Sequence, residues 1–212
     1  MTSSPRWKVL IDKSLAENPT ENVFSLASIE THGNQLRPRV RSHIFRDFMI
    51  ADSKPEFPML LTSTDIRAPK VSQFLQHDVV EQVWWIEGSK HQFRISSHVY
   101  VLPDPRHELH GQFMERMTRV GVTCGMSGMK NLDRGEWEEK RVGLFKTMPS
   151  GLKATWARAE VPGSELSGNG KESEDWPPGV DERDDRGSAD DNWHRALANF
   201  GMVILDPDFV DV

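Results

Sequence analysis

The chain has 212 residues, a mass of 24.2 kDa and a formal net charge of −6 at pH 7. This length is sufficient for one hydrophobic core of ordinary size. The single cysteine, Cys124, excludes an intrachain disulfide and a metal site built from several cysteines, and it favours a reducing compartment. No apolar stretch is long enough to span a membrane and no signal-peptide pattern is present at the N-terminus, so we expect a soluble cytoplasmic protein.

The acidity is concentrated in one segment. Residues 163–192 contain ten Asp and Glu against three Lys and Arg, whereas the rest of the chain has 22 acidic and 23 basic residues. This composition is too polar for a packed core, so we expect 163–192 to be a disordered insertion within a single domain that spans residues 1–212. The net charge of the whole chain therefore does not describe the surface that carries the function.

Short strand-like segments dominate the first half of the chain. Apolar residues first recur at helical spacing, and runs rich in β-branched and aromatic residues then alternate with turn residues. The segment at 136–145 and the stretch after Trp193 give weaker indications of helix or strand. The expected elements are a helix at 7–18, strands at 23–31, 36–48 and 58–64, a helix at 68–77, and strands at 81–87 and 91–102. Two hairpins among five strands predict an antiparallel sheet that closes as a barrel.

The strand at 36–48 carries four arginines. Because side chains alternate between the faces of a strand, Arg37, Arg39 and Arg41 share one face, and Arg46 lies five positions further on. Such a concentration of cations indicates an anionic ligand, with ion pairing to nearby aspartates as the alternative. Nucleic acid is not favoured, because the chain outside the acidic segment is nearly neutral and has no aromatic RNA-binding motif.

The chain has eight histidines, which raises the question of a metal site. His107 and His110 flank a glutamate, but their spacing is i, i+3 rather than the i, i+4 of a zinc-binding helix. We therefore expect no metal centre. The neighbouring Trp84 and Trp85 point to opposite faces of a strand, so we expect one in the core and the other available for a subunit interface.

Three strings, taken in chain order, carry a family resemblance. They are Pro-Arg-Val-Arg-Ser-His-Ile-Phe-Arg-Asp-Phe at 38–48, Thr-Ser-Thr-Asp-Ile-Arg-Ala-Pro-Lys-Val at 62–71, and His-Gln-Phe-Arg-Ile-Ser at 91–96. Together they resemble the pyridoxamine 5'-phosphate oxidase-like family of FMN-binding split β-barrels. The resemblance implies a mainly β (α+β) fold, an antiparallel split β-barrel with flanking helices, and a homodimer with FMN at the subunit interface.

The resemblance also implies an activity. It indicates an FMN-dependent oxidoreductase that transfers a hydride between a small organic substrate and FMN. A non-catalytic or degenerate flavin-binding module is the alternative, because the Trp and Arg that complete the flavin pocket near the C-terminus of family members are not found at 209–212. No catalytic acid or base is implied by the pattern.

The same resemblance implies which residues hold the cofactor. In the family, a six-residue strand segment lines the flavin. Two residues at the end of a later strand, and a lysine six positions after them, bind near the phosphate. A glutamine of a third strand contacts the flavin ring. Family members have an arginine directly before this lysine, where this chain has Pro69, and Arg67 is the candidate to substitute for that arginine. The implied cofactor-binding residues are Arg41, Ser42, His43, Ile44, Phe45, Arg46, Ser63, Thr64, Arg67, Lys70 and Gln92. Independently, a phosphate dianion needs several charged donors, which Arg41, Lys70 and the start of the helix at 68–77 provide.

Overall fold

The computed structural model describes residues 4–163, 176–182 and 191–212. The helices are α1 (Arg6–Glu17), α2 (Pro69–Gln76), α3 (Leu109–Thr118), α4 (Arg134–Lys146), α5 (Ser150–Ala157) and α6 (Asp191–Asn199), with a short 3-10 helix, η1 (Gly125–Met129). The strands are β1 (Val23–His32), β2 (Gln35–Ile44), β3 (Asp47–Met49), β4 (Met59–Asp65), β5 (Val79–Ile86), β6 (His91–Leu102) and β7 (Phe200–Asp211). None of the helices formed by these described residues has the length and apolar character that a membrane span requires.

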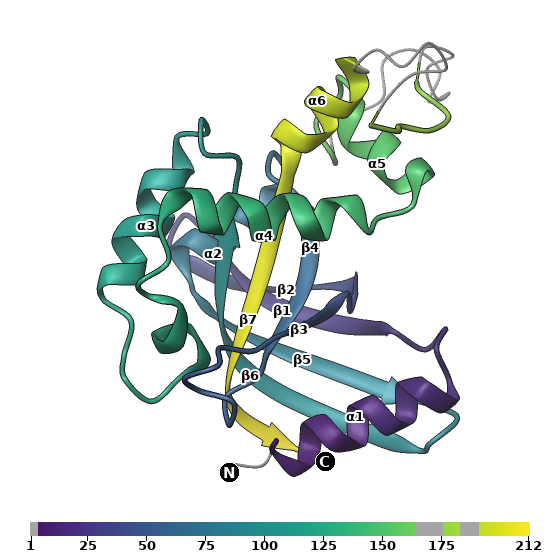
Figure 1. Ribbon diagram of the computed structural model, residues 1–212, viewed down its shortest axis with the longest axis vertical. Helices are drawn as coiled ribbons and strands as arrows, with labels where there is room; N and C mark the ends of the chain where they lie inside the picture. The colour runs from purple at the N-terminus through teal and green to yellow at the C-terminus, as the bar shows by residue number, and fades with distance from the viewer. Residues whose placement is uncertain (1–3, 164–175, 183–190) are drawn as a thin grey trace.

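The strands form one antiparallel sheet in the order β2-β1-β5-β6-β7-β4-β3 (Figure 1). Its two edge strands, β2 and β3, are separated in the chain only by Phe45 and Arg46. The N–H of Phe45 donates to Asn22 beside one edge at 2.7 Å, and that of Arg46 donates to Leu61 beside the other at 2.9 Å. So short a connection requires the sheet to curl until its edges approach each other. This confirms the split barrel, whereas the complete closure expected from the sequence is wrong, because β2 and β3 are not paired.

The predicted helices and five strands are confirmed to within two residues, with one exception. The strand expected at 36–48 is divided into β2 and β3 by the crossing between the sheet edges. The sheet also contains β7, which lies inside it between β6 and β4 and for which the sequence pattern indicated structure only weakly. Residues 200–206 of β7 are buried on both faces, so the period-2 alternation that predicts a strand is absent there.

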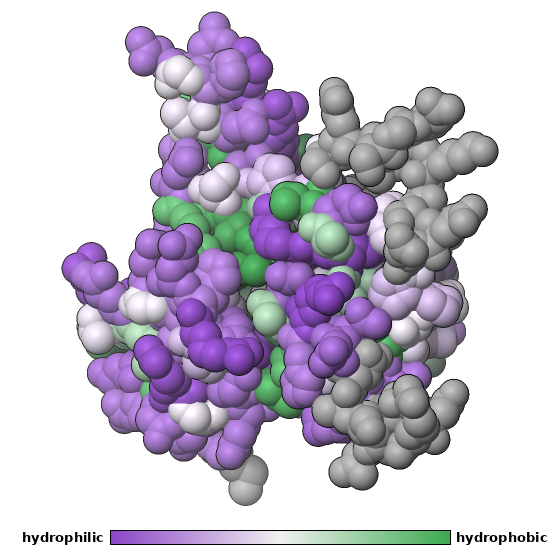
Figure 2. Space-filling model, turned by 90° about the horizontal axis from the view of Figure 1, so that it is seen from above, coloured by the Kyte–Doolittle hydropathy of each residue, from purple (hydrophilic) through white to green (hydrophobic). Residues whose placement is uncertain are grey.

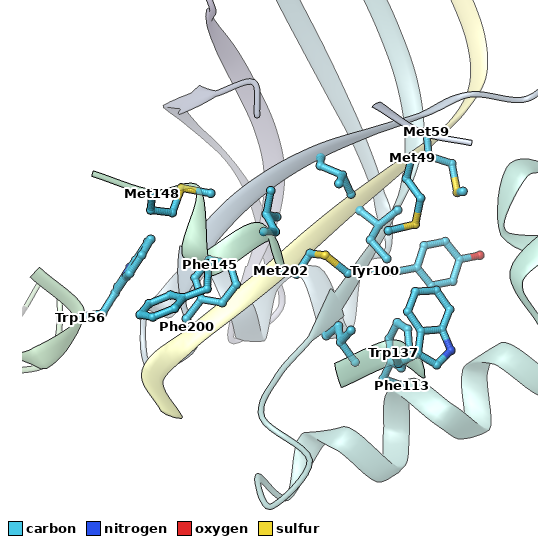
Figure 3. Close-up of a cluster of buried hydrophobic side chains, with 14 of the residues drawn as sticks. Met49, Met59, Tyr100, Phe113, Trp137, Phe145, Met148, Trp156, Phe200 and Met202 are labelled. Carbon is cyan, nitrogen blue, oxygen red and sulfur yellow. The ribbon is translucent and has the colours of Figure 1, made fainter. Parts of the chain in front are cut away.

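Two hydrophobic cores lie on the two faces of the curled sheet. Successive residues of β7 belong to different cores, with Val203 inside the curl and Ile204 outside it. The inner core includes apolar residues of α1 and α2. The outer core lies between the sheet and α3 to α6, and Figure 3 shows its aromatic side chains from both the helices and the strands. Because β4, β6 and β7 are covered on both faces, they form the buried centre that positions the site.

Part of the acidic segment belongs to the outer core. Val180 is 1% exposed, and its N–H donates to the Ser150 carbonyl oxygen at 3.2 Å and to Ser150 Oγ at 2.9 Å. Residues 176–182 are therefore packed against α5. The last two residues of the expected disordered insertion, Asp191 and Asn192, begin α6, whereas residues 164–175 and 183–190 lie outside the described residues. The single-domain organisation stays a prediction.

Candidate functional site

The end of the molecule that carries α5 and α6 is mostly hydrophilic, with a hydrophobic area near its middle (Figure 2). A cleft of about 400 Å³ lies there between the ends of β2 and β4, the start of α2, and α5 with the residues that follow it. Small-molecule and cofactor sites commonly measure about 300–1,000 Å³. Seven of the eleven predicted cofactor-binding residues line this cleft, namely Ser42, His43, Ile44, Arg46, Ser63, Thr64 and Lys70.

The strands position the hydroxyl groups of the cleft. Ser63 and Thr64 lie near the end of β4, where Thr64 pairs with Gly201 of β7. A Cβ atom at Gly201 would lie 3.2 Å from Thr64 Cγ2, so the absence of a side chain in β7 leaves room for Thr64. Because β4 is buried on both faces, its last residues are held firmly where the cleft begins.

Lys70 lies in the first turn of α2. Pro69 starts the helix, a position at which a missing N–H is tolerated, and no side chain caps this helix end. Burial, followed by the nearby charge of Arg41, lowers the pKa of Lys70. An anion bound at this helix end would offset both effects and would be favoured by the helix dipole.

Three buried side-chain nitrogens of the cleft lining have no hydrogen-bond partner within the described structure. They are His43 Nε2, Arg46 Nε and Arg158 Nε. Burial, with the charges of Lys70 and Arg41, lowers the pKa of His43 to about 3, so its imidazole is neutral at pH 7. Buried polar atoms in native proteins are normally satisfied, so three unsatisfied nitrogens around one cleft indicate a polar ligand.

Positive charges outnumber negative ones among the described cleft side chains that form no ion pair. Asp65 is paired with Arg67, with Oδ2 2.7 Å from Nη2, whereas Glu160 accepts a hydrogen bond of 2.9 Å from the neutral Trp176 Nε1 and keeps its negative charge. Arg46, Lys70 and Arg158 form no ion pair with any other described residue. The cleft is thus suited to an anionic ligand.

Two of the predicted arginines do not line the cleft. Arg41 donates to Ser28 Oγ at 2.8 Å and to Gln73 Oε1 at 2.6 Å, which joins β2 to β1 and α2. Arg67 uses its guanidinium for Asp65 and for two backbone carbonyl oxygens beyond α5. The guanidinium of Arg67 therefore makes four hydrogen bonds within the protein, and its role at the phosphate stays a prediction.

Phe45 and Gln92 also lie outside the cleft lining. Phe45 packs in the inner core, with its ring centroid 4.8 Å from that of Phe48 and 5.2 Å from that of Trp84. Gln92 is exposed on β6, where it pairs in register with Trp85 of β5. As cofactor-binding residues, all eleven stay predictions, of which the structure brings seven together.

The wall opposite Lys70 was not predicted. It is formed by Leu152, Thr155, Trp156, Arg158, Glu160, Val161, Pro162, Gly163 and Trp176. Trp176 offered the one usable signal, because it is an aromatic residue in an otherwise polar acidic segment. Arg158 follows α5 without any recognisable motif, so only the fold places it at the cleft.

Comparisons with known proteins give a family-model match over part of the chain and several similar solved structures. Residues 4–103 match the family model described as pyridoxamine 5'-phosphate oxidase, FMN-binding domain. The chain is similar to the structure of a pyridoxamine 5'-phosphate oxidase-related, FMN-binding protein from Nostoc punctiforme, with 19% identity, a TM-score of 0.65, and coverage of 99% of this chain and 85% of that one. A protein from Clostridium acetobutylicum related to general stress protein 26 has 6% identity, a TM-score of 0.45, and coverage of 96% and 86%. No curated protein matches the sequence.

Proposed function

We propose that this protein binds FMN in the cleft and acts as an oxidoreductase, because residues 4–103 match the family model of the pyridoxamine 5'-phosphate oxidase FMN-binding domain. The region that matches the family contains all eleven predicted cofactor-binding residues. The observation that carries the proposal is the chemistry of the cleft, where Arg46, Lys70 and Arg158 have no ion-pair partner in the described structure. The phosphate of FMN would supply the missing negative charge.

The residues present fit FMN. Lys70 and the uncapped start of α2 would hold the phosphate, and the hydroxyl of Ser63 offers a further hydrogen bond, whereas that of Thr64 donates to the carbonyl oxygen of Asp65 at 3.1 Å. Ile44 and Trp156 provide apolar surface for the flavin ring. A bound flavin supplies the capacity to accept and release a hydride, so the protein has only to bind, orient and shield it.

We further propose a homodimer with FMN at the subunit interface. Large apolar side chains are exposed on the outer face of β1, β2 and β5, namely Val23, Leu36, Val40, Val79, Val83 and Trp85. An exposed apolar face of this kind is typical of an interaction surface. Ser42 and Ile44 of the cleft alternate with His43 and share the strand face of Val40, so the cleft adjoins this surface. Gln92 lies on the same side as Trp85, and we assign it to the flavin only within such a dimer.

Flavin binding and turnover are tested separately. The protein is first titrated with FMN. The protein with bound flavin is then mixed with pyridoxamine 5'-phosphate or with a reduced nicotinamide, and the absorbance of the flavin at about 450 nm is followed with and without air. Bleaching without air and recovery under air support an oxidoreductase. Bound flavin that no donor reduces would favour the non-catalytic module, and failure to bind FMN would refute both. The single Cys124 supports the proposed reducing, cytoplasmic setting.

A further inference from the structure

The wall opposite Lys70 is attached directly to the turn that leads into α2. Arg67 Nη1 donates to the carbonyl oxygen of Arg158 at 3.0 Å and to that of Ala159 at 3.3 Å. The same guanidinium binds Asp65 through Nε at 3.0 Å and Nη2 at 2.7 Å. Because Arg67 lies three residues before Lys70, this arrangement brings the backbone of Arg158 beside the proposed phosphate end of the cleft.

The side chain of Arg158 is held in place and forms no ion pair with another described residue. Its guanidinium carbon lies 3.9 Å from the ring centroid of Trp176, and its Nε atom is buried without a hydrogen-bond partner in the described structure. The carboxylate of Glu160, two residues further on, accepts a hydrogen bond from the indole N–H of Trp176. The pKa of Glu160 is lowered by a hydrogen bond from its own backbone, by that of Trp176 and then by the charge of Arg158, without a direct ion pair between the two side chains. An arginine stacked on an aromatic ring keeps the edge of its guanidinium available, and this planar edge matches the oxygens of a phosphate.

We propose that Arg158 is a second phosphate-binding cation of the cleft, which binds the FMN phosphate from the wall opposite Lys70. The inference rests on the proposed FMN binding and adds a contact from outside the region that matches the family. Arg67 is then a positioning residue, which holds the backbone of Arg158 and does not touch the ligand. Arg158, from the loop after α5, thus takes the phosphate-binding role that was expected of Arg67 from the sequence.

A purely structural role for Arg158 predicts a different outcome. If Arg158 only stacks on Trp176 to fasten the wall, its removal would weaken the binding of every flavin equally. Riboflavin has the same ring system as FMN but no phosphate. The ratio of the two dissociation constants therefore isolates the phosphate contact from any loosening of the wall.

The experiment measures the Kd of FMN and of riboflavin, by quenching of flavin fluorescence, for the wild type, Arg158→Gln and Arg158→Lys. Loss of a charged hydrogen bond should weaken FMN binding by about 10- to 100-fold in Arg158→Gln, with riboflavin changed less than about twofold. Arg158→Lys keeps a cation and should bind FMN more tightly than Arg158→Gln. Equal weakening of both flavins, no weakening of FMN, or equal FMN affinity in the two variants would overturn the proposal.

Two further variants keep this result distinct from the proposed function. Arg195 also donates to a backbone carbonyl oxygen near the end of α5, that of Ala157 at 3.4 Å, but does not line the cleft. Arg195→Gln should therefore leave both constants unchanged. If Lys70→Gln loses FMN selectively and Arg158→Gln does not, the proposal for Arg158 fails while FMN binding stands. If the wild type binds no FMN, both fail.

Discussion

Arg67 and Arg158, 91 residues apart in the chain, are joined by a hydrogen bond of 3.0 Å from Arg67 Nη1 to the carbonyl oxygen of Arg158. A second pair in the chain has nearly the same local geometry. Arg106 binds Asp104 through its backbone N–H and Nε to Oδ1 and through Nη2 to Oδ2, as Arg67 binds Asp65. Of these two arginines, Arg67 alone also donates, within the described structure, to distant carbonyl oxygens, those of Arg158 and Ala159. Arg106 is therefore a control that has the same local ion pair without these contacts.

Arg67→Ala should weaken FMN binding through the position of Arg158. We expect the Kd of FMN to rise by about 3- to 30-fold, since one charged contact would be partly lost, with riboflavin binding unchanged. Arg106→Ala removes the equivalent local ion pair and should leave FMN binding unaltered. Titration of the three proteins with both flavins checks this, and an identical response of the two variants would contradict a positioning role.

His43 should make the flavin-free protein less stable in acid. Its pKa is lowered to about 3 in the folded state by burial, whereas an unfolded histidine titrates near 6.5. Between these values the unfolded chain binds a proton that the folded chain does not, so stability falls as the pH falls. From pH 7 to pH 5 the loss should be about 2 kcal/mol.

Urea unfolding of His43→Gln at pH 7 and pH 5 measures this contribution. The difference in unfolding free energy between the two pH values should be smaller by about 2 kcal/mol than in the wild type. His32→Gln, at an exposed position of β1, is the matched control and should retain the wild-type difference. An unchanged difference in His43→Gln would show that the buried imidazole does not control acid stability.

Arg141 should be essential for stability. Its side chain is 0% exposed and ties four groups together, namely the carboxylates of Glu138 and Asp104 and the carbonyl oxygens of Leu197 and Phe200. It therefore joins α4 to the end of α6 and the start of β7. Arg141→Met would leave these acceptors without their donor, and we expect a loss of about 3–5 kcal/mol in unfolding free energy.

Arg119 provides the control for Arg141. It forms an exposed ion pair with Glu115, and its side chain is 74% exposed. Arg119→Met should therefore change the unfolding free energy by less than about 1 kcal/mol. Denaturant titrations of both variants check the comparison, and a loss of similar size in both would contradict the role assigned to the buried arginine.

The proposed dimer predicts that charges on the outer sheet face will separate the subunits. Val40 is 66% exposed and adjoins the cleft, so Val40→Asp should convert a dimer into monomers and weaken FMN binding. Val9→Asp places the same charge on an exposed position of α1 and should have neither effect. Light scattering gives the masses, and a monomeric wild type, or a Val40→Asp dimer, would argue against this interface.

The sequence predicted the elements that are local in the chain. Pro69 indicated the start of the helix that carries Lys70, and runs rich in β-branched and aromatic residues, separated by turn residues, indicated the hairpins β1–β2 and β5–β6. Two features were not accessible in this way. The strand β7 is buried on both faces and shows no alternation, and Arg158 reaches the cleft only because Arg67 and Trp176 hold the wall after α5.

Arg67 shows why the direction of a side chain could not be predicted from the sequence. The direction of its guanidinium depends on Asp65 and on two carbonyl oxygens more than 90 residues away. Such tertiary partners leave no trace in local spacing. Residue identity alone therefore could not separate a ligand-binding arginine from a bracing one.

Calorimetric titration of the flavin-free protein with FMN measures most directly whether this cleft binds the flavin through its phosphate. We predict one FMN per chain in the wild type and affinity lower by about 10- to 100-fold in Lys70→Ala. Lys13→Ala, at an exposed position of α1, should match the wild type. Absence of FMN binding in the wild type, or equal affinity in Lys70→Ala, would contradict the account.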